Sequence, residues 1–146
     1  MESQYARFSA LHIDVARFAT DDFNPFHDRN KWQRIEGNPF GGTIALGFQL
    51  SSFALHGVTM LHAAAPLAQR YLHVRITFAD AVRVDDDVEL TIRPAQHGAD
   101  GTTVSHRIAL RTERSLALTG HIRFVPDAPG DPPAPVEPSR LNDIRD

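Results

Sequence analysis

Apolar side chains recur on nearly every helical face of residues Thr43 to His62, a stretch that contains no proline. A helix that is apolar all round is buried rather than laid on a surface. About 20 residues, each rising about 1.5 Å, make a helix about 30 Å long, and a buried helix of that length needs a sheet that wraps it. We therefore expect a long central helix against a sheet. Its apolar positions are Ile44, Leu46, Phe48, Leu50, Phe53, Leu55, Val58, Met60 and Leu61.

Two glycines interrupt this expected helix. Gly47 and Gly57 each cost about 1 kcal/mol relative to alanine inside a helix. Their presence therefore indicates that another group approaches the helix closely. At Gly47 that group is either strand backbone or a ligand.

The hydrophobic period changes to two after Tyr71, which predicts strands. Apolar residues alternate with polar ones through 72–78 and again through 88–92. Two further runs, 102–112 and 115–124, are separated by Glu113-Arg114 in the manner of a hairpin. With one strand before the helix and four after it, we expect an α+β fold in which an antiparallel sheet wraps the helix.

The N-terminal third predicts shorter elements. Residues Arg7 to Ile13 alternate as a first strand, and Asp14 is a suitable N-cap for a short helix over Val15 to Thr20. Asp28 is a suitable cap for a second short helix that ends at Ile35, with Trp32 and Ile35 on its buried face.

Composition narrows the classes of function. With 146 residues the chain fits one domain, which we place at 1–125. Residues 126–146 hold six of the ten prolines and predict a disordered or surface-draped tail. The absence of cysteine excludes disulfides, thiolate nucleophiles and zinc sites with cysteine ligands.

Charge and hydropathy also argue against two kinds of partner. A net charge of -3 provides no basic field for nucleic acid. The N-terminus has no export pattern and no apolar run approaches 18 residues, so we expect a cytoplasmic protein that does not enter membranes. There is no His-Glu-x-x-His pair, and we expect no metal and no cofactor.

The segment from Asp22 to His27 carries the most chemistry. It places a carboxylate, an amide and an imidazole around Pro25. Proline excludes a continuous helix here, so a turn can bring Asp22 and His27 together. Imidazole is the commonest general acid or base, and a carboxylate can orient it or hold a water. The same residues are also common in turns and caps, which is the alternative interpretation.

The pattern Asp-x-Asn-Pro-x-His, followed by the glycine-rich stretch 41–48, resembles the MaoC-like dehydratases and (R)-specific enoyl-CoA hydratases. The resemblance covers roughly residues 8–124 and implies the hot-dog fold. It also implies that Asp22 and His27 are catalytic. They would activate a water that adds across a trans-2-enoyl thioester, or remove it in reverse, while Asn24 supports the loop. The substrate would be an acyl-CoA or an acyl carrier protein thioester of fatty acid or polyketide metabolism.

The start of the central helix would bind the thioester carbonyl. The backbone N–H of Gly47 lies where a helix N-terminus favours developing negative charge, and Leu46 and Phe48 flank it in the expected substrate site. Family members usually have histidine where this chain has Leu46, and a Gly-Asp pair after the third strand where it has Asp85-Asp86-Asp87. The first difference affects the carbonyl pocket and the second affects a turn.

Two other classes of function stay open. A hot-dog thioesterase would use the same helix start to hydrolyse the thioester, and a non-catalytic module would bind acyl thioesters or serve assembly. The segment from Asp22 to His27 favours hydration. We also expect a homodimer, because a sheet that covers one side of a helix leaves strand edges that need cover.

Overall fold

The computed structural model describes residues 1–62 and 71–125 and shows an antiparallel sheet with one long helix. The predicted tail, 126–146, lies outside the described residues. The elements are β1 (Glu2–Arg7), α1 (Ala10–Thr20), the 3-10 turns η1 (Pro25–His27) and η2 (Trp32–Arg34), α2 (Gly47–Leu61), β2 (Tyr71–Phe78), β3 (Asp87–Ile92), β4 (Gln96–His97), β5 (Val104–Arg111) and β6 (Leu116–Val125).

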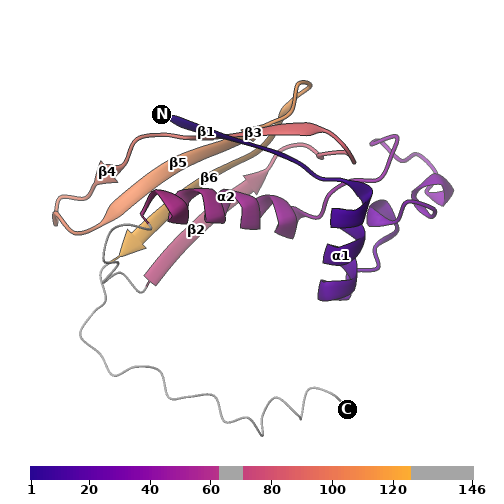
Figure 1. The fold of residues 1–146 in the computed structure, drawn as a ribbon, viewed down its shortest axis with the longest axis horizontal. Helices are drawn as coiled ribbons and strands as arrows, with labels where there is room; N and C mark the ends of the chain where they lie inside the picture. Colours follow the sequence, from indigo (N-terminus) through magenta and orange to yellow (C-terminus); the bar gives the residue numbers. More distant parts are fainter. Residues whose placement is uncertain (63–70, 126–146) are drawn as a thin grey trace, which may run out of the picture.

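The sheet has the order β1-β3-β5-β6-β2, with the short β4 paired to β5. Every pairing is antiparallel. The sheet curves over one side of α2, and α1 with the loop that follows it lies at the N-terminal end of α2 (Figure 1). This is the expected hot-dog arrangement, and the four strands predicted after residue 71 are confirmed.

The core lies between α2 and the inner face of the sheet. Strand register places Leu90 opposite Leu110 and Ile92 opposite Ile108, and all four side chains are buried. The helix presents Leu50, Ala54, Gly57 and Val58 to this core. The outer face of α2 is uncovered, with Phe48 62% exposed and Met60 54% exposed. The prediction of a helix buried all round is therefore wrong for the described chain, because the sheet covers one side only.

Helix α2 begins four residues later than predicted. Residues 43–46 are extended instead, because their backbone groups pair with residues 82–84: Ala45 N–H donates to the carbonyl of Val82, and Val84 N–H donates to that of Thr43. This pairing delivers Leu46 as the N-cap residue and Gly47 as the first residue of the helix.

The two glycines of α2 do mark close approaches. A Cβ atom at Gly57 would lie 2.7 Å from Leu90 Cδ2 and 2.8 Å from Gln4 Oε1, distances that real Cβ atoms do not show. A Cβ at Gly47 would lie 3.1 Å from the ring of Phe78. The neighbour of Gly47 is thus a strand side chain rather than strand backbone.

The predicted strand over 7–13 is wrong in its bounds. The strand is β1, which ends at Arg7, and α1 begins at Ala10. Ser9 caps that helix: its hydroxyl accepts from the N–H of His12, and its own N–H donates to His12 Nδ1. These paired bonds favour the helix over a short apolar alternation. Asp14 lies inside α1 and is not its cap.

The predicted helix from Asp28 to Ile35 is also wrong, since only the single 3-10 turn η2 forms within this range. Asp28 does accept from the backbone N–H groups of Asn30 and Lys31, as a cap would. Trp32 and Ile35 are only half-buried. A helix of two turns needs packing to be stable, and these two side chains provide too little of it.

Candidate active site

The segment from Asp22 to His27 folds as two linked turns at the end of α1. Asp21 adopts the left-handed conformation, and the N–H groups of Asp21 and Asp22 both donate to the carbonyl of Arg17. Asp22 Oδ1 then accepts from Asn24 N–H at 3.1 Å, and Asn24 Oδ1 accepts from Phe26 N–H at 3.1 Å. The turn-and-cap interpretation is correct for Asn24, whose side chain supports the loop. These turns also return His27 towards Asp22.

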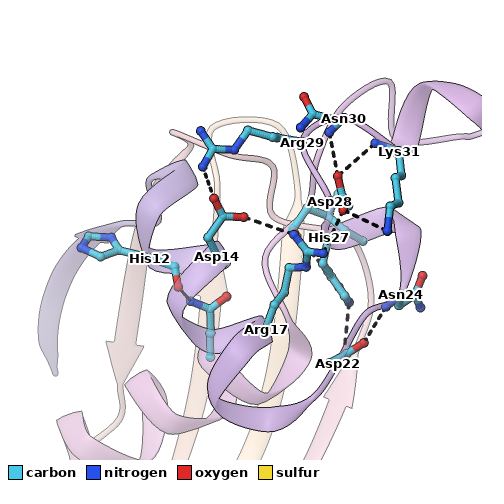
Figure 2. Close-up of polar contacts among 12 residues, drawn as sticks. His12, Asp14, Arg17, Asp22, Asn24, His27, Asp28, Arg29, Asn30 and Lys31 are labelled. Atoms are coloured by element: carbon cyan, nitrogen blue, oxygen red, sulfur yellow. Dashed lines mark hydrogen bonds and ion pairs between the residues drawn. The ribbon is translucent and has the colours of Figure 1, made fainter.

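Asp22 and His27 face one another across a short gap (Figure 2), with Asp22 Oδ2 3.8 Å from His27 Nε2. His27 is 9% exposed, while the Asp22 side chain is 39% exposed. The gap is too long for a direct hydrogen bond. One water oxygen can contact both atoms across it at hydrogen-bond distance.

The other ring nitrogen of His27 determines its tautomer. His27 Nδ1 lies 2.9 Å from the carbonyl oxygen of Ile44. A carbonyl oxygen only accepts, so Nδ1 carries the hydrogen, and in the neutral ring Nε2 holds the free lone pair. The basic nitrogen of His27 is therefore the one that faces Asp22.

His27 and Gly47 line one cavity of about 350 Å³. Apolar residues form most of its wall, and Asp80 also lines it. Phe78 contributes the ring that lies against Gly47. The remaining lining residues are Phe40, Ile44, Ala45, Leu50, Ala79, Ala81 and Val82.

The start of α2 supplies polarised N–H groups beside this cavity. The first N–H groups of a helix have no partner within it and carry the positive end of the helix dipole. Gln49 fixes this end of α2, because its Oε1 accepts from the N–H of Leu46 and its Nε2 donates to the carbonyl of His12 on α1. The helix start and α1 therefore form one unit.

The structure separates the other two expected site residues from His27. Leu46 is 2% exposed and belongs to the core. Phe48 points into a second, apolar groove of about 560 Å³ between α1 and the outer face of α2. Neither side chain lines the cavity that contains His27 and Gly47.

A buried ion cluster next to the pair was not anticipated from the sequence (Figure 2). Arg17, on α1, donates to Asp28 Oδ2 at 2.9 Å and to Asp14 Oδ1 at 3.2 Å. Arg29 also pairs with Asp14. The i,i+3 spacing of Asp14 and Arg17 on a helix was the available signal.

Asp28 is held in its ionised form mainly by a backbone hydrogen bond, with Arg17 of this cluster adding to the effect. The backbone N–H of Asn30 is the main cause of its lowered pKa; burial opposes that effect, and the charge of Arg17 and the N–H of Lys31 reinforce it. Asp28 is therefore a fixed negative charge on the residue that directly follows His27 in the sequence.

Within 1–62 and 71–125, no three metal-ligating side chains come together. In the same ranges, no helix has the length and apolarity needed to cross a membrane.

No protein-family model and no curated protein sequence matches the chain. Solved structures do resemble it. The (R)-hydratase from A. caviae involved in PHA biosynthesis aligns with a TM-score of 0.65 at 19% identity, over 86% of this chain and 93% of that one. The MaoC-like dehydratase from Rhodospirillum rubrum aligns with a TM-score of 0.59 at 19% identity, over 88% and 90%.

A probable thioesterase from Bartonella henselae also aligns, with a TM-score of 0.52 at 12% identity over 85% of this chain and 87% of that one. At such low identities these likenesses establish the hot-dog fold. Activity has to be argued from the residues of this chain.

Proposed function

We propose that the protein is a hydratase or dehydratase of enoyl and 3-hydroxyacyl thioesters. The observation that carries this proposal is the 3.8 Å separation of Asp22 Oδ2 and His27 Nε2, beside a cavity that His27 shares with the first residue of α2. A base, a water position and a carbonyl-polarising helix start are the groups that the reaction needs.

In hydration, a water held between Asp22 and His27 loses a proton to His27 Nε2 while its oxygen bonds to C3 of the enoyl thioester. The electrons of the C2=C3 double bond move towards the thioester carbonyl, whose oxygen accepts from first-turn N–H groups near Gly47. The proton on His27 Nε2 is then transferred to C2, so that His27 returns to its neutral form and one water is added in total. Dehydration is the same sequence in reverse.

The supporting residues keep the basic nitrogen correctly placed. Ile44 accepts from His27 Nδ1, which stabilises the ring when Nε2 takes up a proton. Asn24 closes the turn. No metal or cofactor enters these steps, and the acyl group is carried as a thioester of CoA or of an acyl carrier protein.

A direct assay tests this function. The purified protein is incubated with a short trans-2-enoyl-CoA, and both the conjugated enoyl chromophore and free thiol are followed. Loss of the chromophore without thiol release is expected. Thiol release would instead indicate a thioesterase, and binding without either change would indicate an acyl-thioester-binding module.

We further infer that the working form is a homodimer. β2 is an edge of the sheet and exposes Leu72, Val74 and Phe78. Apolar edges of this kind need cover, and Phe78 also lines the cavity, so a second copy over β2 would close the site. Sedimentation at micromolar concentration should give about twice the 16.2 kDa chain mass; a clean monomer would contradict this inference.

A further inference from the structure

Arg17 contacts both halves of the candidate catalytic loop. Its backbone carbonyl accepts the N–H of Asp22 at 3.0 Å, and its guanidinium donates to Asp28 Oδ2 at 2.9 Å. Asp28 directly follows His27 in the chain. One residue of α1 therefore holds Asp22 through its main chain and the neighbour of His27 through its side chain.

Asp28 transmits this hold to the loop. Its Oδ2 accepts from Arg17, and its Oδ1 accepts from the N–H groups of Asn30 at 2.8 Å and Lys31 at 3.1 Å. Both oxygens are used, so the carboxylate cannot turn without losing several charge-assisted hydrogen bonds. Its backbone, and with it that of His27, is fixed relative to α1 (Figure 2).

The stability of the folded protein does not by itself explain why Arg17 and Asp28 form a buried ion pair. Arg17 is 5% exposed, and its Nε is buried with no partner among the described residues. A buried ion pair gains little over apolar side chains of similar volume, because removing charges from water is costly. What a buried, forked arginine does provide is a fixed geometry.

We propose that Arg17 is a positioning residue for the Asp22–His27 pair: through Asp28 it sets the separation of Asp22 Oδ2 and His27 Nε2 and so the place of the water. This inference rests on the proposed hydratase function. It does not require Arg17 to touch the substrate.

Arg17→Met tests the proposal, since it removes the guanidinium group and retains an aliphatic side chain of similar length. Misplacing reacting groups by about 1 Å can cost about 100-fold in rate. We therefore expect kcat for enoyl-CoA hydration to fall about 10- to 100-fold, while KM changes less than about threefold. Arg17→Lys, which keeps one charge and loses the fork, should lie between wild type and Arg17→Met.

The matched control is Arg7→Met. Arg7 also pairs with an aspartate, donating from two nitrogens to Asp87 at 2.8 and 2.7 Å, but that pair is exposed on the sheet edge. Its removal should leave both kcat and KM unchanged. An equal loss of kcat in Arg7→Met would overturn the proposal, because the effect would then be general to ion pairs of this protein.

A second measurement is independent of activity. The ring nitrogen signals of His27 in histidine-labelled protein report its tautomer and hydrogen bonds by NMR. They should change in Arg17→Met and Arg17→Lys, while those of His62 and His106 stay as in wild type. If the wild type hydrates no enoyl thioester, the proposed function fails, and these signals alone decide the role of Arg17.

Unchanged kcat together with unchanged His27 signals in a folded Arg17→Met would overturn the proposal. If Arg17→Met does not fold, Arg17→Lys decides in the same way: wild-type kcat and wild-type His27 signals count against the proposal, and a lowered kcat with altered His27 signals supports it.

Discussion

A histidine lies near each end of α2, and the two histidines face different chemical groups. Near the N-terminal end, His27 faces a carboxylate, Asp22, and borders a cavity. At the C-terminal end, His62 Nε2 lies 2.8 Å from His106 Nε2, and the His62 ring also packs against Phe124. Burial and a second imidazole both disfavour the protonated form of His62.

Neither His62 nor His106 lines the cavity that contains His27, and we expect this pair to have a structural role. His106 Nδ1 lies 3.0 Å from the carbonyl oxygen of Arg93, so that nitrogen donates and His106 Nε2 accepts from His62. Burial is the main cause of the lowered pKa of His62, and the neighbouring His106 adds to it. We therefore expect that the group an imidazole faces, rather than the histidine itself, decides whether it can exchange protons in catalysis.

The largest expected effect is on activity, and it distinguishes the Asp22–His27 pair from the His62–His106 pair. Asp22→Asn or His27→Gln should lower kcat for enoyl-CoA hydration by about two to four orders of magnitude, the usual contribution of a positioned acid or base. The double variant should be scarcely worse than the worse single one, because both residues act on one water. Steady-state kinetics of folded variants measures this.

His62→Gln is the matched comparison and should retain wild-type kcat. Near-normal turnover in well-folded His27→Gln, or a loss in His62→Gln as large as that in His27→Gln, would break the distinction between the two ends of the helix.

Alanine substitutions at the two glycines of α2 should differ in their effect on the free energy of unfolding. Gly57→Ala places a methyl group 2.7 Å from Leu90 Cδ2 inside the core and should destabilise the protein by about 1–3 kcal/mol, as overpacking does. Gly47→Ala meets only the half-exposed Phe78 ring at 3.1 Å, which can move, and should change stability by less than about 1 kcal/mol.

The loss of kcat/KM should be larger in Gly47→Ala than in Gly57→Ala, because Gly47 borders the cavity and Gly57 does not. Urea unfolding and kcat/KM of the two variants are the measurements. Equal losses of stability, or a greater loss of activity in Gly57→Ala, would contradict the assignment of the site to the N-terminal end of α2.

The smallest expected effect concerns pH. The pKa of His62 in the folded protein is below its ordinary value of 6.5, so between those two values the unfolded chain binds more protons than the folded one. Stability from this group is present above about pH 6.5 and is lost as pH falls through the folded pKa. His62→Gln should flatten the fall in melting temperature between pH 7 and pH 5 by a few degrees.

His56→Gln provides the control for this measurement, since His56 is an exposed histidine on the same helix. It should keep the pH dependence of the wild type. An equally flattened curve in His56→Gln would mean that the His62–His106 pair is not the source of the effect.

Local sequence patterns were reliable where many residues repeat one signal. The period-two runs after residue 71 predicted β2, β3, β5 and β6, because alternate side chains of a half-buried strand must be apolar. The same reasoning failed for residues 7–13, where two hydrogen bonds between Ser9 and His12 favour a helix over a brief alternation.

In the candidate site, too, contacts between neighbours in the sequence were predicted and contacts between distant residues were not. Six consecutive residues brought Asp22 and His27 together, because proline and two side-chain-to-backbone turns dictate a compact local path. The contact of Arg17 with Asp28, 11 residues away, was missed because no periodicity links an α1 residue to a later turn. The sequence likewise could not predict that the Phe48 side chain lies in a different pocket from the one that Gly47 lines, since this depends on where α2 begins.

The sequence by itself determined the four strands after residue 71, the presence of a central helix and the proximity of Asp22 and His27, because each follows from neighbours along the chain. Only the tertiary structure decided that α2 is covered on one side, that Phe78 from β2 lies against Gly47, and that a buried arginine joins α1 to the loop. Those contacts connect residues distant in sequence, and their geometry is set by the packing of the sheet on the helix rather than by local propensity.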